Sequence, residues 1–224
     1  MNQKPRTKER PRSEAGFSLL ELLVVIVILG IVAAMAIPSW QRMKKNARLN
    51  GDAHSMSGML SVAKLRGAAN FTESRLFFFT GTDQTQYFRV DVWDKTLNGG
   101  VGCWVPDGAV NPQCITTSGL TRNETFLSQG VSAGYGSLST SPLTGVNLAQ
   151  AASCMQGGTS PTAGGSAISD TSCIQFNSRG FPTPPSAAGI YITDGTRVYG
   201  IVTNAMGLIH SYATPASSAS WKAY

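Results

Sequence analysis

Two groups of residues in this chain of 224 residues could do chemistry: one carboxylate in an apolar run, and four cysteines. Glu21 is the sole charged residue between Glu14 and Arg42, among aliphatic and small neighbours. A carboxylate near hydrocarbon costs a few kcal/mol unless a cation pairs with it. Glu21 therefore predicts an electrostatic partner within an apolar environment.

The cysteines are Cys103, Cys114, Cys154 and Cys173. Four cysteines allow three disulfide pairings, and short loops favour Cys103–Cys114 and Cys154–Cys173 without excluding the others. A zinc site would normally include two cysteines separated by two to four residues, and no such pair occurs. We therefore expect disulfides, which persist in exported proteins.

Catalytic motifs are absent from the sequence. It contains neither Gly-x-Ser-x-Gly nor His-Glu-x-x-His, and its two histidines, His54 and His210, lie far apart. Carboxylates are also sparse, with 12 Asp and Glu residues in total. We therefore predict no enzymatic activity, no cofactor and no metal site.

A single long helix is predicted from Phe17 to about Ala69. The run from Phe17 to Ile37 could span about 30 Å of hydrocarbon, and Pro38 should kink the helix. The second half is amphipathic, with its polar side at Lys45, Arg48, Asp52 and Ser55. Its apolar stripe follows alternating steps of four and three residues: Leu49, Ala53, Met56, Leu60 and Ala63.

Strand patterns follow the helix. An antiparallel hairpin is predicted at residues 76–79 and 87–93. A meander of three strands is predicted at residues 189–193, 196–203 and 208–212. A further short strand is expected at residues 172–176. Between them, residues 98–170 are rich in Gly, Ser, Thr and Asn, which predicts a long insertion of irregular loops held by disulfides. The predicted fold class is α+β: a long N-terminal helix packed on a C-terminal antiparallel β-sheet domain.

The N-terminal segment resembles the class III signal of type IV prepilins and type II secretion pseudopilins. The residues that carry the resemblance are Gly16, Phe17, Ser18, Leu19-Leu20 and Glu21, after a basic leader. The resemblance implies cleavage between Gly16 and Phe17 by a prepilin peptidase, and N-methylation of Phe17 by the same peptidase/methyltransferase. It also implies that Glu21 pairs with the terminal amine of a neighbouring subunit, so that the partners are other pilins in a fibre.

Three alternatives compete for this segment. Ala34-Met35-Ala36 could be the cleavage site of an ordinary secretory signal, but Glu21 then falls inside an apolar region that is too long. A plain transmembrane anchor would not need the Gly-Phe-Ser start. A lipoprotein signal fails because no cysteine precedes Cys103.

The resemblance also divides the chain and orients it. Residues 1–16 form the cleaved leader, 17–38 the membrane and fibre-core helix, 39–70 the amphipathic half, and 71–224 the exported domain. The leader contributes +3 to the formal net charge of +6. Cations also follow the apolar run, so charge alone leaves the orientation open. The motif places the leader in the cytoplasm and the C-terminal domain in the periplasm, on a single-pass bacterial inner-membrane protein that later joins a fibre.

The basic residues Arg42, Lys44, Lys45 and Arg48 follow the apolar run. Beside Trp40, we interpret them as an anchor at the level of the lipid headgroups. The alternative interpretation is charge pairing with acidic residues of a neighbouring subunit.

The C-terminal segment, about residues 171–212, resembles GspH/FimT-type minor pilins and pseudopilins. Some FimT-type members bind DNA through arginines that follow the final glycine turn, whereas Leu208, Ile209 and His210 follow Gly207 here. A nucleic-acid partner is therefore weakly supported, by loop cations such as Arg122 and Arg179. The residues that carry the resemblance are Ile174, Phe176, Asn177, Gly180, Ile190, Ile192, Arg197, Ile201, Val202 and Gly207.

Together these features predict a non-enzymatic minor pilin or pseudopilin near a fibre tip, supporting assembly and protein secretion, motility or DNA uptake. The alternative is a binding module on such a fibre, for DNA or a surface, that uses the insertion at residues 98–170. The sequence leaves open whether a type II secretion system, a type IV pilus or a competence machine contains the subunit.

Overall fold

The computed structural model describes residues 18–81, 86–115, 123–162 and 165–224. The predicted leader and the cleavage site between Gly16 and Phe17 lie outside these residues. The chain divides into two compact units, one up to Met43 and one from Lys44 to Tyr224, and each is described by itself.

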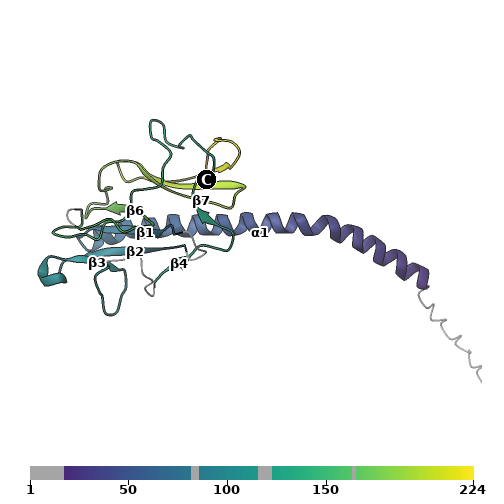
Figure 1. Ribbon diagram of the computed structural model, residues 1–224, viewed down its shortest axis with the longest axis horizontal. Helices are drawn as coiled ribbons and strands as arrows, with labels where there is room; N and C mark the ends of the chain where they lie inside the picture. Colours follow the sequence, from purple (N-terminus) through teal and green to yellow (C-terminus); the bar gives the residue numbers. More distant parts are fainter. Residues whose placement is uncertain (1–17, 82–85, 116–122, 163–164) are drawn as a thin grey trace, which may run out of the picture. The chain divides into compact units, whose positions relative to one another are not determined.

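Helix α1 spans Leu19–Ala69, 51 residues, as the sequence predicts (Figure 1). Pro38 lies inside this helix, and its kink remains a prediction. The helix ends where the Thr72 backbone N–H donates to the carbonyl of Gly67, at 3.1 Å. This closure requires Phe71 to adopt a φ of +48°, a conformation in which glycine is usual.

The second unit contains two antiparallel sheets rather than one. The first has the order β3-β2-β1-β6, with β4 paired to β2, and the second has the order β10-β9-β8-β7-β5. A short 3-10 helix, η1, spans Asn98–Gly100. The strands are β1 Ser74–Phe79, β2 Tyr87–Asp94, β3 Cys103–Pro106, β4 Thr125–Phe126, β5 Ser132–Ala133, β6 Thr171–Phe176, β7 Ala188–Thr193, β8 Arg197–Thr203, β9 Ile209–Pro215 and β10 Lys222–Ala223.

The predicted hairpin and meander are both present, as β1–β2 and β7–β8–β9. The sequence did not predict the partner of β6. This strand pairs with β1 and so belongs to the first sheet, whereas the meander that follows it forms part of the second. A turn redirects the chain here: the side-chain oxygen of Asn177 accepts hydrogen bonds from the backbone of Arg179 and Phe181, at 2.9 and 3.1 Å. This Asx-type turn carries the chain from one sheet to the other.

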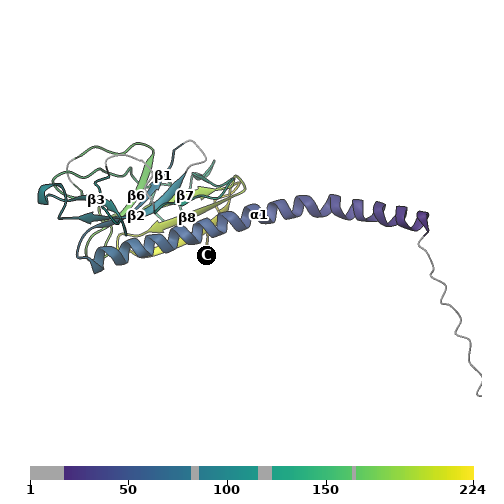
Figure 2. The same cartoon turned by 90° about the horizontal axis from the view of Figure 1, so that it is seen from below.

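Strands of both sheets lie along the second half of α1 (Figure 2), and one hydrophobic core joins this half to both sheets. Leu76 and Phe88 contribute to it from the first sheet, and Ile190 and Ile201 from the second. Each fully buried aliphatic or aromatic side chain stabilises the fold by roughly 1.5–3 kcal/mol. The predicted apolar stripe of the helix is confirmed, because all five of its residues are completely buried: Leu49, Ala53, Met56, Leu60 and Ala63.

Asp52 corrects one prediction, because it lies on the predicted polar side of the helix but is buried. Its carboxylate accepts hydrogen bonds from the backbone N–H and the hydroxyl of Ser128, at 2.8 and 2.9 Å. The insertion therefore reaches the helix and uses Asp52 as a hydrogen-bonded anchor.

The insertion is integral to the domain rather than a separate loop. It supplies β3 and β4 to the first sheet and β5 to the second. It also joins the two sheets through backbone hydrogen bonds. The Ala151 N–H donates to the carbonyl of Gly189 in β7, at 2.7 Å, and the Ala152 carbonyl accepts from the N–H of Cys173 in β6, at 2.8 Å. The side-chain amide of the preceding residue, Gln150, accepts a hydrogen bond from the N–H of Tyr191 at 3.0 Å and donates one to its carbonyl at 2.7 Å.

A first prediction concerns the end of α1. Phe71 is 77% exposed, so its ring gains little from packing, while its positive φ costs about 1–2 kcal/mol. We expect Phe71→Gly to raise the free energy of unfolding by about 0.5–1 kcal/mol, after the entropy of glycine in the unfolded chain is deducted. Urea unfolding in detergent, followed by the fluorescence of buried Trp93 and Trp104, measures this change.

Ala69→Gly is the matched control, because Ala69 is the last residue of the helix and glycine there should destabilise it by a few tenths of a kcal/mol. A loss of stability in Phe71→Gly would show that the exposed ring stabilises the domain.

Candidate functional site

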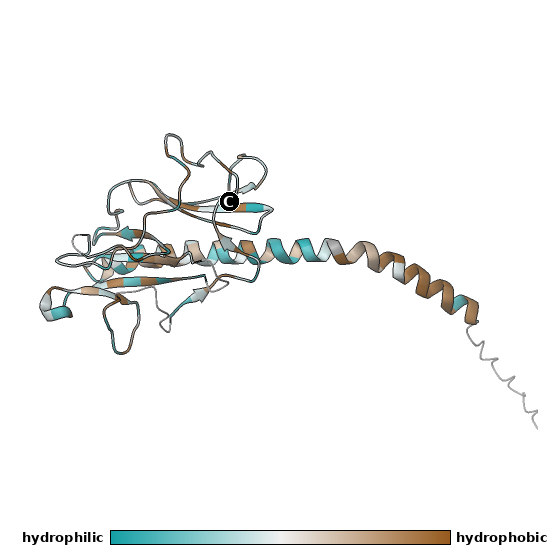
Figure 3. Cartoon of the chain, viewed as in Figure 1, coloured by the Kyte–Doolittle hydropathy of each residue, from teal (hydrophilic) through white to brown (hydrophobic). Residues whose placement is uncertain are grey.

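The residues of the first half of α1 are mostly apolar (Figure 3), and their large side chains are exposed. The large side chains from Leu19 to Ile37 are between 45% (Val25) and 82% (Leu19) exposed. By length and composition, this helix could cross a membrane. An all-round apolar surface of this kind requires lipid or other apolar helices around it.

Glu21 lies in the first turn of α1 and is exposed. A carboxylate at this position is favoured by the positive end of the helix dipole. Within the described residues it has no ion pair. A cation that neutralises Glu21 must therefore come from outside the described part of the chain, either from the N-terminal residues or from another molecule.

A buried ion network lies on the face of the first sheet that points away from α1. Arg75 and Asp91 are directly opposite each other on β1 and β2. The two carboxylate oxygens of Asp91 accept from Arg75 Nε at 3.0 Å and from Arg89 Nε at 2.9 Å. Arg89 also pairs with Glu124 of the insertion, at 3.1 Å. Two carboxylates thus balance two guanidinium groups.

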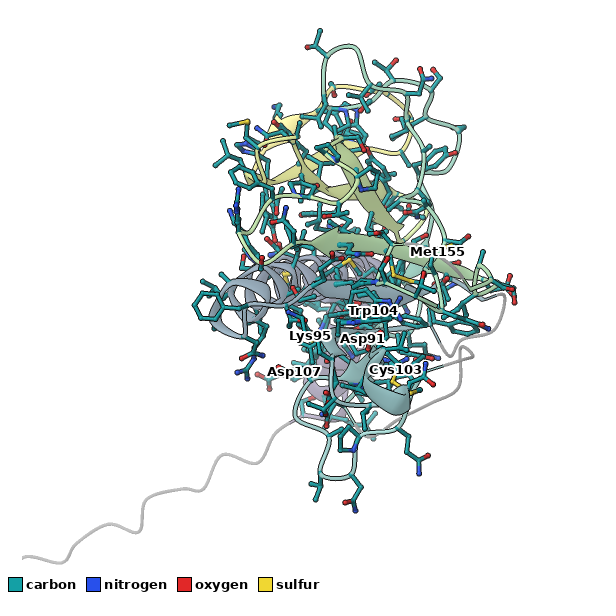
Figure 4. All side chains as sticks on the ribbon, turned by 90° about the vertical axis from the view of Figure 1, so that its left-hand side faces the viewer. Asp91, Lys95, Cys103, Trp104, Asp107 and Met155 are labelled. Atoms are coloured by element: carbon teal, nitrogen blue, oxygen red, sulfur yellow. A yellow bond between two sulfur atoms is a disulfide. The ribbon has the colours of Figure 1, made fainter. Side chains whose placement is uncertain are left out.

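Aromatic rings and the insertion enclose this network. The Arg75 guanidinium lies 4.2 Å from the centre of the Trp104 ring, and the Arg89 guanidinium 4.3 Å from that of Phe77. Arg75 also donates to the carbonyl of Met155, at 2.6 Å. Figure 4 labels Asp91, Trp104 and Met155, all of which contact Arg75. Such cation–π contacts add to the ion pairs when the groups are desolvated.

The two arginines respond differently to burial. Burial lowers the pKa of Arg75 to about 10, although Asp91 opposes the shift. For Arg89, burial is the largest single influence and acts to lower the pKa, but the charge and hydrogen bond of Asp91, together with Tyr87 and Glu124, outweigh it, so the pKa is raised. Both groups are charged at neutral pH, so the network is a fixed structural link between the sheet and the insertion.

This network was not predicted from the sequence. The available signal was the order of residues in β2, where Arg89 and Asp91 alternate on one side of the strand between Tyr87 and Trp93. Charged residues flanked by aromatic residues on one strand face indicate that the face is buried and that its charges are paired.

The disulfides are Cys103–Cys114 and Cys154–Cys173, with Cα atoms 5.4 and 5.0 Å apart, as the short loops favoured. The first disulfide closes the loop between residues 103 and 114. This loop contacts α1 through an ion pair of 2.7 Å between Asp107 and Arg66. At the tip of this loop, Val110 is 92% exposed. The second disulfide fixes the insertion to β6.

The glycine turn near the C-terminus presents apolar side chains. Gly207 has a φ of +75°, and the neighbouring Met206 and Leu208 are 67% and 55% exposed. His210 and Arg179 are exposed, and Arg122 lies outside the described residues. Across the residues that the structure describes, no group of three or more His, Cys, Asp or Glu could hold a metal ion.

Comparison with known proteins gives matches that include the N-terminal segment. Residues 11–37 match the family model of the prokaryotic N-terminal methylation motif. A fimbrial protein of Pseudomonas aeruginosa is 25% identical over 91 residues, 41% of this chain and 56% of the relative. Type II secretion system core protein G of the same species is 37% identical over 57 residues, 24% of this chain and 40% of the relative.

The chain thus spans about half the length of the curated relatives that it matches. No solved structure gives a significant match.

A second prediction concerns the ion network. Asp91→Asn leaves two buried guanidinium groups with reduced compensation, so we expect a loss of about 3–5 kcal/mol in the free energy of unfolding. The control is Asp107→Asn, which breaks a pair whose Arg66 side chain is 50% exposed and should cost less than about 1 kcal/mol. Urea unfolding of both variants measures the difference, and equal losses would contradict a stabilising role specific to the buried network.

Proposed function

We propose that this chain, whose matches to known proteins support membership of the type IV pilin and pseudopilin superfamily, is a non-enzymatic minor pilin or pseudopilin. The observation that carries the proposal is the first half of α1. It exposes a continuous apolar surface that contains one carboxylate, Glu21, without an ion pair in the described residues. Such a helix fits a bundle of identical or related helices that provides both the apolar contacts and the missing cation.

In the proposed pathway, a prepilin peptidase cleaves between Gly16 and Phe17 and N-methylates Phe17. The new terminal amine lies four residues before Glu21 in the sequence, so each mature subunit carries one cation and one anion close together. Pairing the amine of one subunit with Glu21 of the next removes most of the cost of burying each charge alone. The pairing also favours one register between subunits.

Before assembly, the subunit is proposed to be a single-pass inner-membrane protein with its second unit in the periplasm. The resemblance of the C-terminal segment to GspH/FimT-type subunits supports a minor role, near the tip of a type IV pilus or type II secretion pseudopilus. The turn that begins at Asn177 and the glycine turn at Gly207 are both formed in the structure. The fibre would then serve secretion, motility or DNA uptake.

A third prediction tests the role of Glu21. Glu21→Gln keeps the size of the side chain but removes its charge, so we expect incorporation into sheared fibres to fall about tenfold or more, which corresponds to about 1.4 kcal/mol. Immunoblots of the fibre and membrane fractions measure incorporation. The two disulfides and the protease resistance of the second unit should not change.

Gln41→Ala is the control for this experiment, because it changes an exposed polar residue on the same helix outside the apolar run. Incorporation of Glu21→Gln at the wild-type level would refute the proposed pairing.

A second candidate function is a fibre-borne binding module. The surface that fits this role best is the loop closed by Cys103–Cys114, which exposes Val110 almost completely, whereas other parts of the insertion supply strands to the two sheets. An exposed apolar tip on a disulfide-closed loop fits contact with another surface.

A fourth prediction tests this candidate. Val110→Asp should leave the stability and incorporation of the subunit unchanged and should reduce adhesion or secretion by the assembled machine about tenfold. Met206→Asp, at another exposed apolar position, is the matched control. If neither variant alters any fibre-dependent phenotype, the loop has no binding role and the structural function alone remains.

A further inference from the structure

Two turns of the second unit are built in the same way. They begin at Asn177 and Asn204, and the side-chain oxygen of each asparagine accepts hydrogen bonds from the N–H groups two and four residues later, at 2.9 to 3.1 Å. The third residue after each asparagine is a glycine, Gly180 or Gly207, with a φ of +77° or +75°. Its N–H donates to the asparagine carbonyl at 2.9 Å in both turns. These bonds hold both turns in one conformation.

The two turns contact each other and helix α1. A side chain at Gly207 would place its first carbon 2.5 Å from the carbonyl oxygen of Gly180, so only glycine allows this contact. The side chain of Lys64 in α1 lies against Gly180, and its ammonium donates to the carbonyl of Gly207 at 2.8 Å. The turns and this part of the helix therefore form one continuous surface.

Three apolar side chains on this surface are exposed. Phe181 and Leu208, each the fourth residue after its asparagine, are 40% and 55% exposed, and Leu65 of α1 is 67% exposed. The second residues after the asparagines are an arginine and a methionine, so only the fourth position is apolar in both turns. Single exposed apolar side chains are normal, but several in one place indicate a contact surface. The paired-turn surface consists of Lys64, Leu65, Phe181 and Leu208.

Lys64 places a positive charge between these apolar side chains. It is partly buried, and within the described parts of the chain it forms no ion pair. Its ammonium has three N–H donors, and the acceptor that it meets is the neutral carbonyl of Gly207. A hydrogen bond from an ammonium to a carboxylate is roughly twice as strong as one between neutral groups. A partner that supplies a carboxylate would therefore complement this surface.

A second copy of the chain and nucleic acid both fit this surface less well. Nucleic acid is bound by clustered cations, whereas the paired-turn surface has one cation among three apolar side chains. A second copy offers few free carboxylates, because most of those described in the second unit already accept hydrogen bonds within it, including Asp52, Asp91, Asp107 and Glu124. A different protein with a free carboxylate is the better match.

We propose that the paired-turn surface binds another, non-identical subunit of the fibre through an apolar side chain of that subunit and a neighbouring carboxylate. The apolar side chain packs among Leu65, Phe181 and Leu208, and the carboxylate pairs with Lys64. Because hydrogen bonds already fix both turns, binding costs little conformational entropy. This contact rests on the proposed function of the chain as a fibre subunit, and it assigns a surface and a chemistry to one partner.

Photo-cross-linking of the full-length chain, in the bacterium that assembles the fibre, tests the proposal. A benzophenone amino acid replaces Met206, which is exposed and lies beside the paired-turn surface without being part of it. Mass spectrometry then identifies the attached peptide. We expect a peptide of another pilin-like subunit in which Asp or Glu lies close to an apolar residue.

The matched control carries the same amino acid at Val62. This residue is 42% exposed and lies two positions before Lys64, so its side chain is on a different side of the helix. It should not yield the Met206 product. The same product from both positions would overturn the proposal, because the contact would then not be specific to the paired turns.

Charge variants test the role of Lys64. Lys64→Glu should reduce the cross-linked product about tenfold or more, and Lys64→Arg should retain it. Changing the acidic residue of the attached peptide to lysine should also remove the product, and combining this change with Lys64→Glu should restore it. Restoration also shows that the Lys64 variant is folded. Lys95→Glu is the control, because Lys95 likewise donates to a backbone carbonyl, that of Phe71 at 2.8 Å.

Several results would overturn the proposal: a product with a second copy, with nucleic acid, with a protein that is not a pilin, or with a peptide that lacks a carboxylate. If the chain enters fibres in a Glu21-dependent manner but gives no product, the docking surface is wrong and the proposed function stands. If the product forms but Glu21→Gln enters fibres normally, the Glu21 pairing is wrong and the docking surface stands. Failure of both measurements would refute both proposals.

Discussion

The second unit depends on one apolar stripe of α1 that contacts both sheets at once. The first sheet meets it through Leu76 and Phe88, and the second through Ile190 and Ile201. Between the sheets themselves, the insertion forms a link through Ala151 and its neighbours. Without the helix, the inner faces of both sheets would be open to water, so the helix is as much a part of this core as either sheet.

The sequence predicted the elements that follow a local period. The stripe from Leu49 to Ala63 repeats every three or four residues, so its burial follows from local geometry. The strands of the hairpin and meander were recognised from short runs of β-branched and aromatic residues bounded by turns. The division into two sheets could not be predicted, because it depends on which strand pairs with β6. That choice is a non-local pairing of β1 with β6, which a local pattern does not encode.

The candidate site was predictable to a similar degree. Glu21 stood out because a charge in an apolar run is rare, and the short disulfide loops were the simplest of three pairings. The ion network was hidden, because Arg75, Asp91 and Glu124 lie far apart in sequence and meet only through the sheet and the insertion. The burial of Asp52 was not predicted for the same reason. Its hydrogen-bond partner, Ser128, lies in a segment without regular periodicity.

The direction of the buried stripe has a mechanical consequence within the second unit. The stripe from Leu49 to Ala63 follows the axis of α1, and all of its side chains are buried in the core shared with both sheets. A force along the helix axis therefore acts as shear on a row of interlocked side chains, which must all slide together, rather than as peeling that would break contacts one at a time. The second unit should thus resist an axial pull on its helix better than a sideways one.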